Sequence, residues 1–173
     1  MKFIIRCATA GVVVMCLGQT ACSGESLPPV GEDGVTFMGD EAPMMKKAMA
    51  RARRELDDFL ALAESPADHL DSFAVKVGLP APDDQTEYVW INSFELQADG
   101  KYVGIINNEL ELTDEYELGD QYTFARSEIV DWTYIDSRER KMYGNYTLCA
   151  LLSQAPPDEA AAYMKQYKLD CEL

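Results

Sequence analysis

The sequence predicts an α+β fold, in which a long N-terminal helix packs on a curved antiparallel sheet of about five or six strands and a short C-terminal helix follows. Residues 40–65 carry apolar side chains at three- and four-residue steps, as an amphipathic helix does. Residues 87–152 alternate apolar and polar side chains between turn signals, which is typical of consecutive strands. Helix and sheet would each have one apolar face, so each must bury that face against the other.

The N-terminal helix is expected to begin after Asp40, a suitable N-cap residue, and to end at Ser65-Pro66. Pro43 falls in the first turn, where its missing N–H group has no intrahelical partner to lose. The apolar face comprises Met45, Met49, Ala52, Leu56, Phe59, Leu60 and Ala63. The opposite face is charged and rich in Lys and Arg, and we interpret it as a solvated face with i, i+4 ion pairs.

The strands are expected at residues 71–79, 87–96, 102–107, 121–125, 129–136 and 143–152. Asp99-Gly100 is a strong two-residue hairpin signal, because a tight turn needs the positive φ that glycine adopts freely. Residues 102–107 should therefore pair antiparallel with residues 90–96. The acidic stretch 108–120 is expected to wrap the sheet edge as an irregular loop or a short helical turn. A short helix is predicted over residues 158–168, after Pro156-Pro157.

Alternation along residues 129–136 separates two faces of that strand. Asp131 lies on one face with Ile129 and Thr133, and Trp132 lies on the other with its apolar neighbours. We expect Trp132 to fill the core against Trp90 and the long helix.

The N-terminus has the features of a secretory signal. Basic Lys2 and Arg6 precede an uncharged apolar run over residues 7–17, which is too short for a permanent membrane span. Thr20-Ala21-Cys22 then places small residues before a modifiable cysteine, so residues 1–22 are predicted to be a lipoprotein-type signal with a lipid on Cys22. Gln19 departs from the usual apolar residue at its position. The alternative is ordinary cleavage after Ser23 or Gly24 and a soluble periplasmic protein.

Three further segments follow the signal. Residues 23–39 are rich in Gly, Pro, Ser and acidic residues and are predicted to be a flexible linker. Residues 40–155 form the α+β domain, and residues 156–173 form a C-terminal helical extension. A signal, a lipid and a linker together predict a periplasm-facing lipoprotein of the cell envelope.

Cys149 and Cys171 are the two cysteines that remain in the mature domain beyond Cys22. In an oxidising compartment they can pair and tie the end of the C-terminal helix to the last strand. The alternative, which the sequence leaves open, is a buried Cys149 and a free Cys171.

The chain is strongly acidic, with a formal charge of −15 that becomes two units more negative once Lys2 and Arg6 leave with the signal. Such a surface repels nucleic acid and anionic lipid head groups. A charged partner should therefore be cationic: a basic protein face, a polyamine or a divalent metal. The alternative is that the charge only keeps the domain soluble.

Several short motifs in the central block carry a family resemblance. They are Val89-Trp90, Gly104, Leu118-Gly119-Asp120, Ile129-Val130-Asp131-Trp132, Tyr134 and Gly144-Asn145-Tyr146-Thr147. In their order and spacing the chain resembles the bacterial family of domain of unknown function 2314 (DUF2314, YegJ-like), from about Met49 to Leu152. The resemblance implies a small α+β domain, often exported or lipid-anchored, without an active site to carry over. Where the family often has a histidine before the Val-Trp pair, this chain has Tyr88.

Known catalytic and cofactor motifs are absent from the sequence. His69, the single histidine, sits in a Pro66-Ala67-Asp68 turn and is interpreted as a surface residue. The sequence contains no P-loop, dinucleotide fingerprint, H-E-x-x-H motif, G-x-S-x-G elbow or paired C-x-x-C motif. Aligning Gly119 with the EF-hand glycine puts Tyr116, Leu118 and Ala125 on ligand positions, so that motif fails. We therefore predict no catalytic residue, no metal ligand and no cofactor.

One polar group in the central block is a candidate binding site. Glu128, Asp131, Tyr143 and Asn145 would form a shallow polar groove if their strands lie side by side. The alternative is that Asp131 only accepts hydrogen bonds from the backbone or from Arg126. The sequence thus predicts a non-enzymatic binding or accessory domain with a protein partner in the envelope. A carboxylate-based enzyme acting on an envelope polymer or small molecule, a toxin-immunity-like protein and a weak metal binder are the alternatives.

Overall fold

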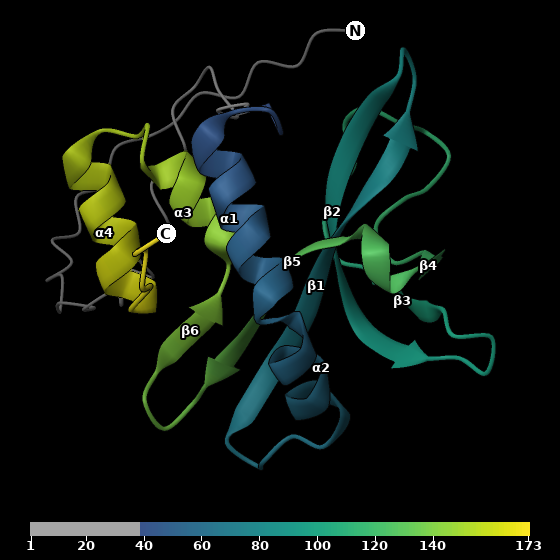
Figure 1. Ribbon diagram of the computed structural model, residues 1–173, viewed down its shortest axis with the longest axis horizontal. Helices are drawn as coiled ribbons and strands as arrows, with labels where there is room; N and C mark the ends of the chain where they lie inside the picture. The colour runs from purple at the N-terminus through teal and green to yellow at the C-terminus, as the bar shows by residue number, and fades with distance from the viewer. Residues whose placement is uncertain (1–38) are drawn as a thin grey trace, which may run out of the picture. The chain divides into compact units, whose positions relative to one another are not determined.

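The computed structural model describes residues 39–173, which form one α+β unit (Figure 1). Its helices are α1 (Pro43–Arg54), α2 (Leu56–Glu64), η1 (Arg126–Glu128), α3 (Tyr146–Leu152) and α4 (Pro157–Tyr167). Its strands are β1 (Leu70–Ala81), β2 (Gln85–Leu96), β3 (Tyr102–Ile106), β4 (Gln121–Phe124), β5 (Ile129–Asp136) and β6 (Lys141–Gly144). The predicted signal (1–22), its lipidated Cys22 and all but the last residue of the predicted linker (23–39) lie outside the described residues.

The six strands form one antiparallel sheet in the order β4-β3-β2-β1-β5-β6. Each strand pairs antiparallel with its neighbours, and β1 is central because it pairs with both β2 and β5. The predicted antiparallel sheet is confirmed, as is the hairpin that joins β2 to β3 at Asp99-Gly100. Its turn is longer than the expected two residues, because the Gln97 N–H donates to the Lys101 carbonyl at 2.7 Å, and Gly100 (φ +84°) has the positive φ while Asp99 does not. Residues 107–120 form an irregular loop, as expected, and the carboxylate of Glu87 fixes it by accepting the N–H groups of Glu111 and Leu112 at 2.5 and 2.9 Å.

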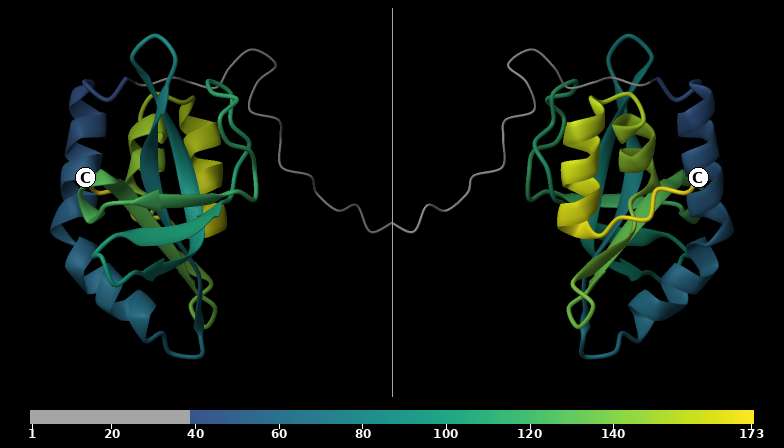
Figure 2. Two further views of the ribbon diagram at one scale, coloured as in Figure 1. Left: turned by 90° about the vertical axis from the view of Figure 1, so that its right-hand side faces the viewer. Right: turned by 90° about the vertical axis from the view of Figure 1, so that its left-hand side faces the viewer.

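The prediction of a single long N-terminal helix is wrong. The chain instead forms two helices that meet at Glu55, whose backbone (φ −100°, ψ 3°) leaves the helical conformation. The break lets α2 change direction and follow the sheet, as Figures 1 and 2 show. Asp40 is not the N-cap, since Ala42 holds that position. The Asp40 carboxylate accepts a hydrogen bond from the Tyr88 hydroxyl instead.

The prediction of a last strand over residues 143–152 is also wrong for most of that range. Strand β6 ends at Gly144, and α3 takes the following residues. Gly144 (φ +73°) and Asn145 (φ +55°) both adopt left-handed conformations, which turn the chain out of the sheet. Cys149 therefore lies in a helix rather than in a strand. The predicted C-terminal helix is confirmed as α4.

The main core lies between the sheet and the helices α1, α2 and α3. Its buried apolar side chains include Ala48 and Ala52 of α1, Phe59 of α2, Val75 of β1 and Ala150 of α3. Small alanines allow α1 and α3 to lie side by side, as seen in Figure 1. Trp132 joins this core as expected, stacking on Phe59 at 4.9 Å between ring centroids.

Trp90 does not pack with Trp132, contrary to the prediction. It is the register partner of Lys76 in β1, which is in turn the partner of Asp131 in β5. Because successive residues of a strand point to opposite faces, Trp90 lies on the face opposite to Trp132 and is only half-buried.

The C-terminal segment packs through a second, smaller apolar cluster of Leu152, Ala160 and Leu169. A disulfide bond joins Cys149 of α3 to Cys171, which follows α4. Within residues 39–173, no helix has the length and apolar character needed to cross a membrane.

Candidate functional site

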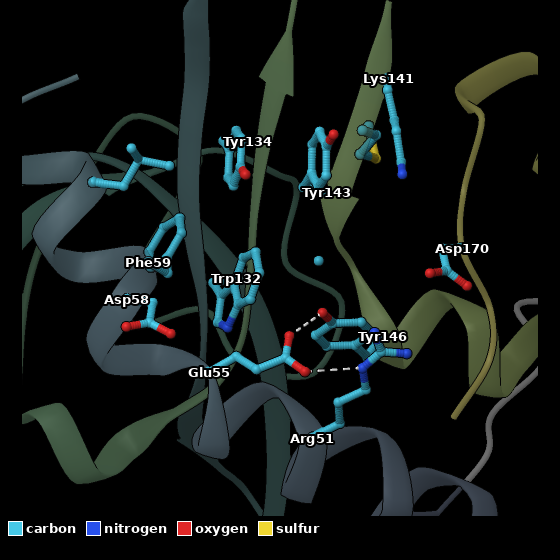
Figure 3. A pocket seen from close by; sticks show the side chains of 13 residues that line it. Arg51, Glu55, Asp58, Phe59, Trp132, Tyr134, Lys141, Tyr143, Tyr146 and Asp170 are labelled. Carbon is cyan, nitrogen blue, oxygen red and sulfur yellow. Dashed lines mark hydrogen bonds and ion pairs between the residues drawn. The ribbon is translucent and has the colours of Figure 1, made fainter. Parts of the chain in front are cut away.

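A cleft of about 360 Å³ opens where the end of α1, the start of α2, the β5–β6 hairpin and the C-terminal segment meet (Figure 3). Its lining combines aromatic rings with charged side chains. The lining residues are Arg51, Glu55, Asp58, Phe59, Leu62, Trp132, Tyr134, Lys141, Met142, Tyr143, Gly144, Tyr146 and Asp170.

Four aromatic rings form one wall of the cleft. Ring centroids lie 4.9 Å apart for Phe59 and Trp132, 6.1 Å for Trp132 and Tyr134, and 4.9 Å for Tyr134 and Tyr143. Trp132 and Tyr134 share a face of β5, and Tyr143 is the register partner of Tyr134 on β6. The indole N–H of Trp132 donates to the Ala52 carbonyl at 3.0 Å, so the wall is anchored to α1.

The floor of the cleft is a polar cluster around Glu55, at the break between α1 and α2. Glu55 accepts a hydrogen bond from Arg51 Nε at 3.1 Å and another from the Tyr146 hydroxyl. The Arg51 guanidinium lies 4.4 Å from the centroid of the Tyr146 ring and donates through Nη1 to the Glu172 carbonyl. Burial and the bond to Glu55 raise the pKa of Tyr146, so its hydroxyl stays protonated. Arg51 is thus held by the Glu55 carboxylate, the Tyr146 ring and the Glu172 carbonyl.

The rim of the cleft carries the remaining charges. Lys141 Nζ lies 4.5 Å from the Tyr143 ring centroid, and the hydroxyl of that ring donates to Glu139 at 2.7 Å. This bond, helped by partial burial, raises the pKa of Tyr143 to about 12. Asp58 and Asp170 form no ion pair with any residue in 39–173. Three carboxylates and two cations therefore line the cleft. Glu55 and Arg51 pair with each other, whereas Asp58, Asp170 and Lys141 form no ion pair within residues 39–173, which leaves the unpaired groups with a net charge of −1.

Asp131, the centre of the predicted polar groove, is fully buried with none of its surface exposed. Its carboxylate accepts four hydrogen bonds, from the N–H groups of Trp132 (2.9 Å), Tyr146 (3.2 Å) and Thr147 (2.7 Å) and from the Thr147 hydroxyl (2.7 Å). Two of these N–H groups open α3, where Asn145 provides no side-chain cap. Asp131 therefore caps a helix that begins 15 residues after it, toward the C-terminus.

Lys76 completes the surroundings of Asp131. Its ammonium donates to Thr147 Oγ1 at 2.8 Å and lies 4.7 Å from the Trp90 ring centroid. Burial lowers the pKa of Lys76 and raises that of Asp131, and the charge of each partner opposes the shift of the other. The network of Trp90, Lys76, Thr147 and Asp131 is closed on itself, so we interpret it as structural. Arg126, the other expected partner of Asp131, pairs with Asp57 instead.

The other predicted site residues are dispersed. Glu128 is exposed and accepts the Ala125 N–H at 2.6 Å within η1. Asn145 is half-buried, with its amide nitrogen 3.2 Å from the Met142 sulfur. Of the four, only Tyr143 lines the cleft. Arg51, Glu55 and Asp170 were missed because only the tertiary fold brings the C-terminal segment against the junction of α1 and α2.

No group of three or more His, Cys, Asp or Glu side chains within residues 39–173 is arranged to hold a metal ion. The cleft can instead receive a side chain, with aromatic rings to contact its apolar part and carboxylates to contact a positive charge. The fold and the cleft thus define a small α+β domain with an open cleft lined by aromatic and charged side chains.

The chain belongs to the bacterial family described as "Uncharacterized protein conserved in bacteria (DUF2314)", whose model matches residues 42–171. It is similar to "Uncharacterized protein YegJ" of Escherichia coli (strain K12), with 32% identity over 129 residues that cover 74% of this chain and 80% of that protein. No solved structure matches the chain. The family resemblance predicted from the sequence motifs is confirmed, and the match extends through α4.

Proposed function

We propose that this chain is a non-enzymatic binding or accessory domain, held at the bacterial envelope by a lipid on Cys22, whose cleft receives a cationic side chain of a protein partner. The observation that carries the binding role is the cleft itself. A fixed aromatic wall stands beside the carboxylates of Asp58 and Asp170, which have no ion-pair partner within residues 39–173. A lysine or arginine of a partner would supply that missing charge and place its methylenes against the rings.

Two further properties support a cationic partner. The ammonium group of Lys141 already lies against the Tyr143 ring, so the rings of this wall are suitable neighbours for a cation. The formal charge of −15 would steer a basic protein toward the domain and speed its association at low salt. An immunity-like role, in which the domain neutralises a basic toxin, is one version of this proposal. It rests on charge alone.

The enzymatic alternative is less well supported. Asp131, the predicted acid or base, is fully buried and already accepts four hydrogen bonds, so it has no path to a substrate. Glu55 reaches the cleft, but Arg51 and Tyr146 occupy its oxygens. A general acid or base must come within hydrogen-bond reach of the reacting atom, and neither Asp131 nor Glu55 is free to do so. Asp58 and Asp170 are the carboxylates of the cleft that remain for such a role.

Binding in the cleft can be tested with a fluorescein-labelled tetra-arginine peptide and the full chain at low salt. We expect Asp170→Asn to weaken binding about fivefold, since one exposed carboxylate–cation contact contributes about 1 kcal/mol. The matched control is Asp84→Asn, which removes the same charge from the exposed β1–β2 turn. Fluorescence anisotropy gives the dissociation constants. An equal loss in both variants would mean that the peptide follows net charge and not the cleft.

The membrane anchor can be tested by fractionating cells that produce the full chain. We expect Cys22→Ser to move the protein from the membrane to the soluble fraction, because the acyl chains on Cys22 would supply the membrane affinity. Cys16→Ser, within the apolar run of the signal, is the control and should leave the protein in the membrane fraction. Unchanged fractionation of Cys22→Ser would argue for the soluble periplasmic alternative.

A further inference from the structure

The C-terminal segment, residues 169–173, forms one wall of the cleft. Helix α4 ends at Tyr167, and Lys168 (φ +48°) turns the chain back toward α3 and the cleft. Asp170 then lines the cleft directly. Two residues later the carbonyl of Glu172 accepts the hydrogen bond from Arg51 Nη1. The residues on either side of Cys171 therefore both shape the binding site.

The disulfide to Cys149 is the strongest link between this segment and the rest of the domain. Leu169 is buried. After it, the segment has one N–H···O hydrogen bond to another element, which Arg51 donates to the Glu172 carbonyl. The Cys149 sulfur lies 3.9 Å from the Asp170 carbonyl, which is a weak contact, and the Glu172 N–H bonds within the segment to Asp170. Leu173 is only half-buried against the core. Without the covalent bond, little would keep Asp170 and the Glu172 carbonyl in place.

The two cysteine residues differ in their exposure to solvent. Cys149 is 3% exposed, whereas Cys171 is only half-buried. A thiolate from a small dithiol or a dithiol protein can therefore reach Cys171, form a mixed disulfide with it and release Cys149 as a thiolate, which takes up a proton. The second thiol of the donor then closes its own disulfide and releases Cys171 as a thiol. The protein gains two electrons and two protons, and the donor loses them.

We propose that the Cys149–Cys171 disulfide controls the cleft: the oxidised protein has a complete wall, and reduction by a dithiol frees residues 170–173, withdraws the Asp170 carboxylate and releases Arg51. The expected loss of ligand affinity rests on the proposed function, whereas the movement of the wall does not. In the reduced protein, Arg51 loses its carbonyl partner and keeps its ion pair with Glu55, so its guanidinium is less constrained beside the cleft.

The movement of the wall can be tested without any ligand, by NMR of the full chain before and after adding a dithiol reductant. We expect the Arg51 Nε–H signal to shift, because reduction removes the Glu172 contact. The Trp132 Nε1–H signal should stay in place, because its acceptor is the Ala52 carbonyl in α1. Cys171→Ser should reproduce the reduced spectrum. An unchanged Arg51 signal would overturn the inference, and so would loss of both signals, which would mean global unfolding.

Binding of the tetra-arginine peptide then separates the inference from the function on which it rests. We expect the reduced protein and Cys171→Ser to bind about tenfold more weakly than the oxidised protein, and reoxidation of the native chain to restore its affinity. Asp170→Asn should lose most of its sensitivity to reduction, since the group that reduction withdraws is already gone. If the peptide binds neither form while Arg51 moves, the proposed function fails and the redox control of the wall stands. If it binds both forms equally, the control fails and the proposed function stands.

Discussion

Asp131→Asn is expected to lower the free energy of unfolding by about 3 to 5 kcal/mol, the usual effect of removing one partner from a buried charged network. The wild-type carboxylate accepts four hydrogen bonds, two of them from the N–H groups that open α3. An amide of the same shape brings an NH₂ group into a site that supplies only donors. It also leaves the ammonium of Lys76, whose pKa is lowered by burial, without its countercharge. Urea denaturation of the full chain measures the change.

Two companion variants separate the parts of this network. Thr147→Val removes the hydroxyl that links Lys76 to Asp131 but keeps the shape of the side chain, so a smaller loss of about 1 to 3 kcal/mol is expected. Lys76→Met combined with Asp131→Asn should cost less than the sum of the two single changes, because the two groups interact. If Asp131→Asn left stability unchanged and abolished peptide binding, Asp131 would belong to a binding site and the structural interpretation would be wrong.

Gly144→Ala is expected to destabilise the domain by about 2 to 5 kcal/mol. Gly144 has φ +73°, a conformation that costs an L-residue about 1 to 2 kcal/mol. A Cβ atom at this position would also lie 2.1 Å from the Trp132 carbonyl oxygen and 2.5 Å from its ring, so the strand or the ring must move. Overpacking of this kind adds about 1 to 3 kcal/mol. Because Gly144 and Trp132 both line the cleft, near-ultraviolet circular dichroism should change as well.

Gly100→Ala is the matched control for this prediction. Gly100 has a similar φ of +84°, but no atom lies within 4 Å of the position that its Cβ would take. We expect only the conformational cost, about 1 to 2 kcal/mol, and an unchanged aromatic spectrum. Equal effects of the two substitutions in urea denaturation would show that the close approach of Trp132 to Gly144 contributes nothing.

Local patterns predicted most of the sheet. Strand β5 was placed at its observed bounds from the alternation of residues 129–136, and the β2–β3 hairpin from Asp99-Gly100. Both signals act within a few residues of the chain: one is the period of side-chain direction, and the other is the positive φ of a turn glycine. Neither depends on a distant partner.

Helix α3 could not be predicted in the same way. Residues 146–152 are almost entirely apolar, and a short apolar run does not distinguish a buried strand from a buried helix. The helix is favoured by the Asp131 carboxylate, which caps its first N–H groups from a different element. The break at Glu55 was also not predicted, and the carboxylate of this residue accepts a hydrogen bond from Tyr146, 91 residues away in the chain.

By itself the sequence determined the strongly acidic charge, the antiparallel sheet and the family. The secretory and lipoprotein features of the N-terminus stay predictions. These depend on composition, periodicity and short motifs, which are local. Only the tertiary structure decided the role of Asp131 and the position of the candidate site. The Asp131 carboxylate is buried and accepts hydrogen bonds from the first N–H groups of α3, so it caps that helix. The packing of α1, α2, β5, β6 and a disulfide-bonded C-terminal segment assembled a cleft from residues that no sequence pattern connects.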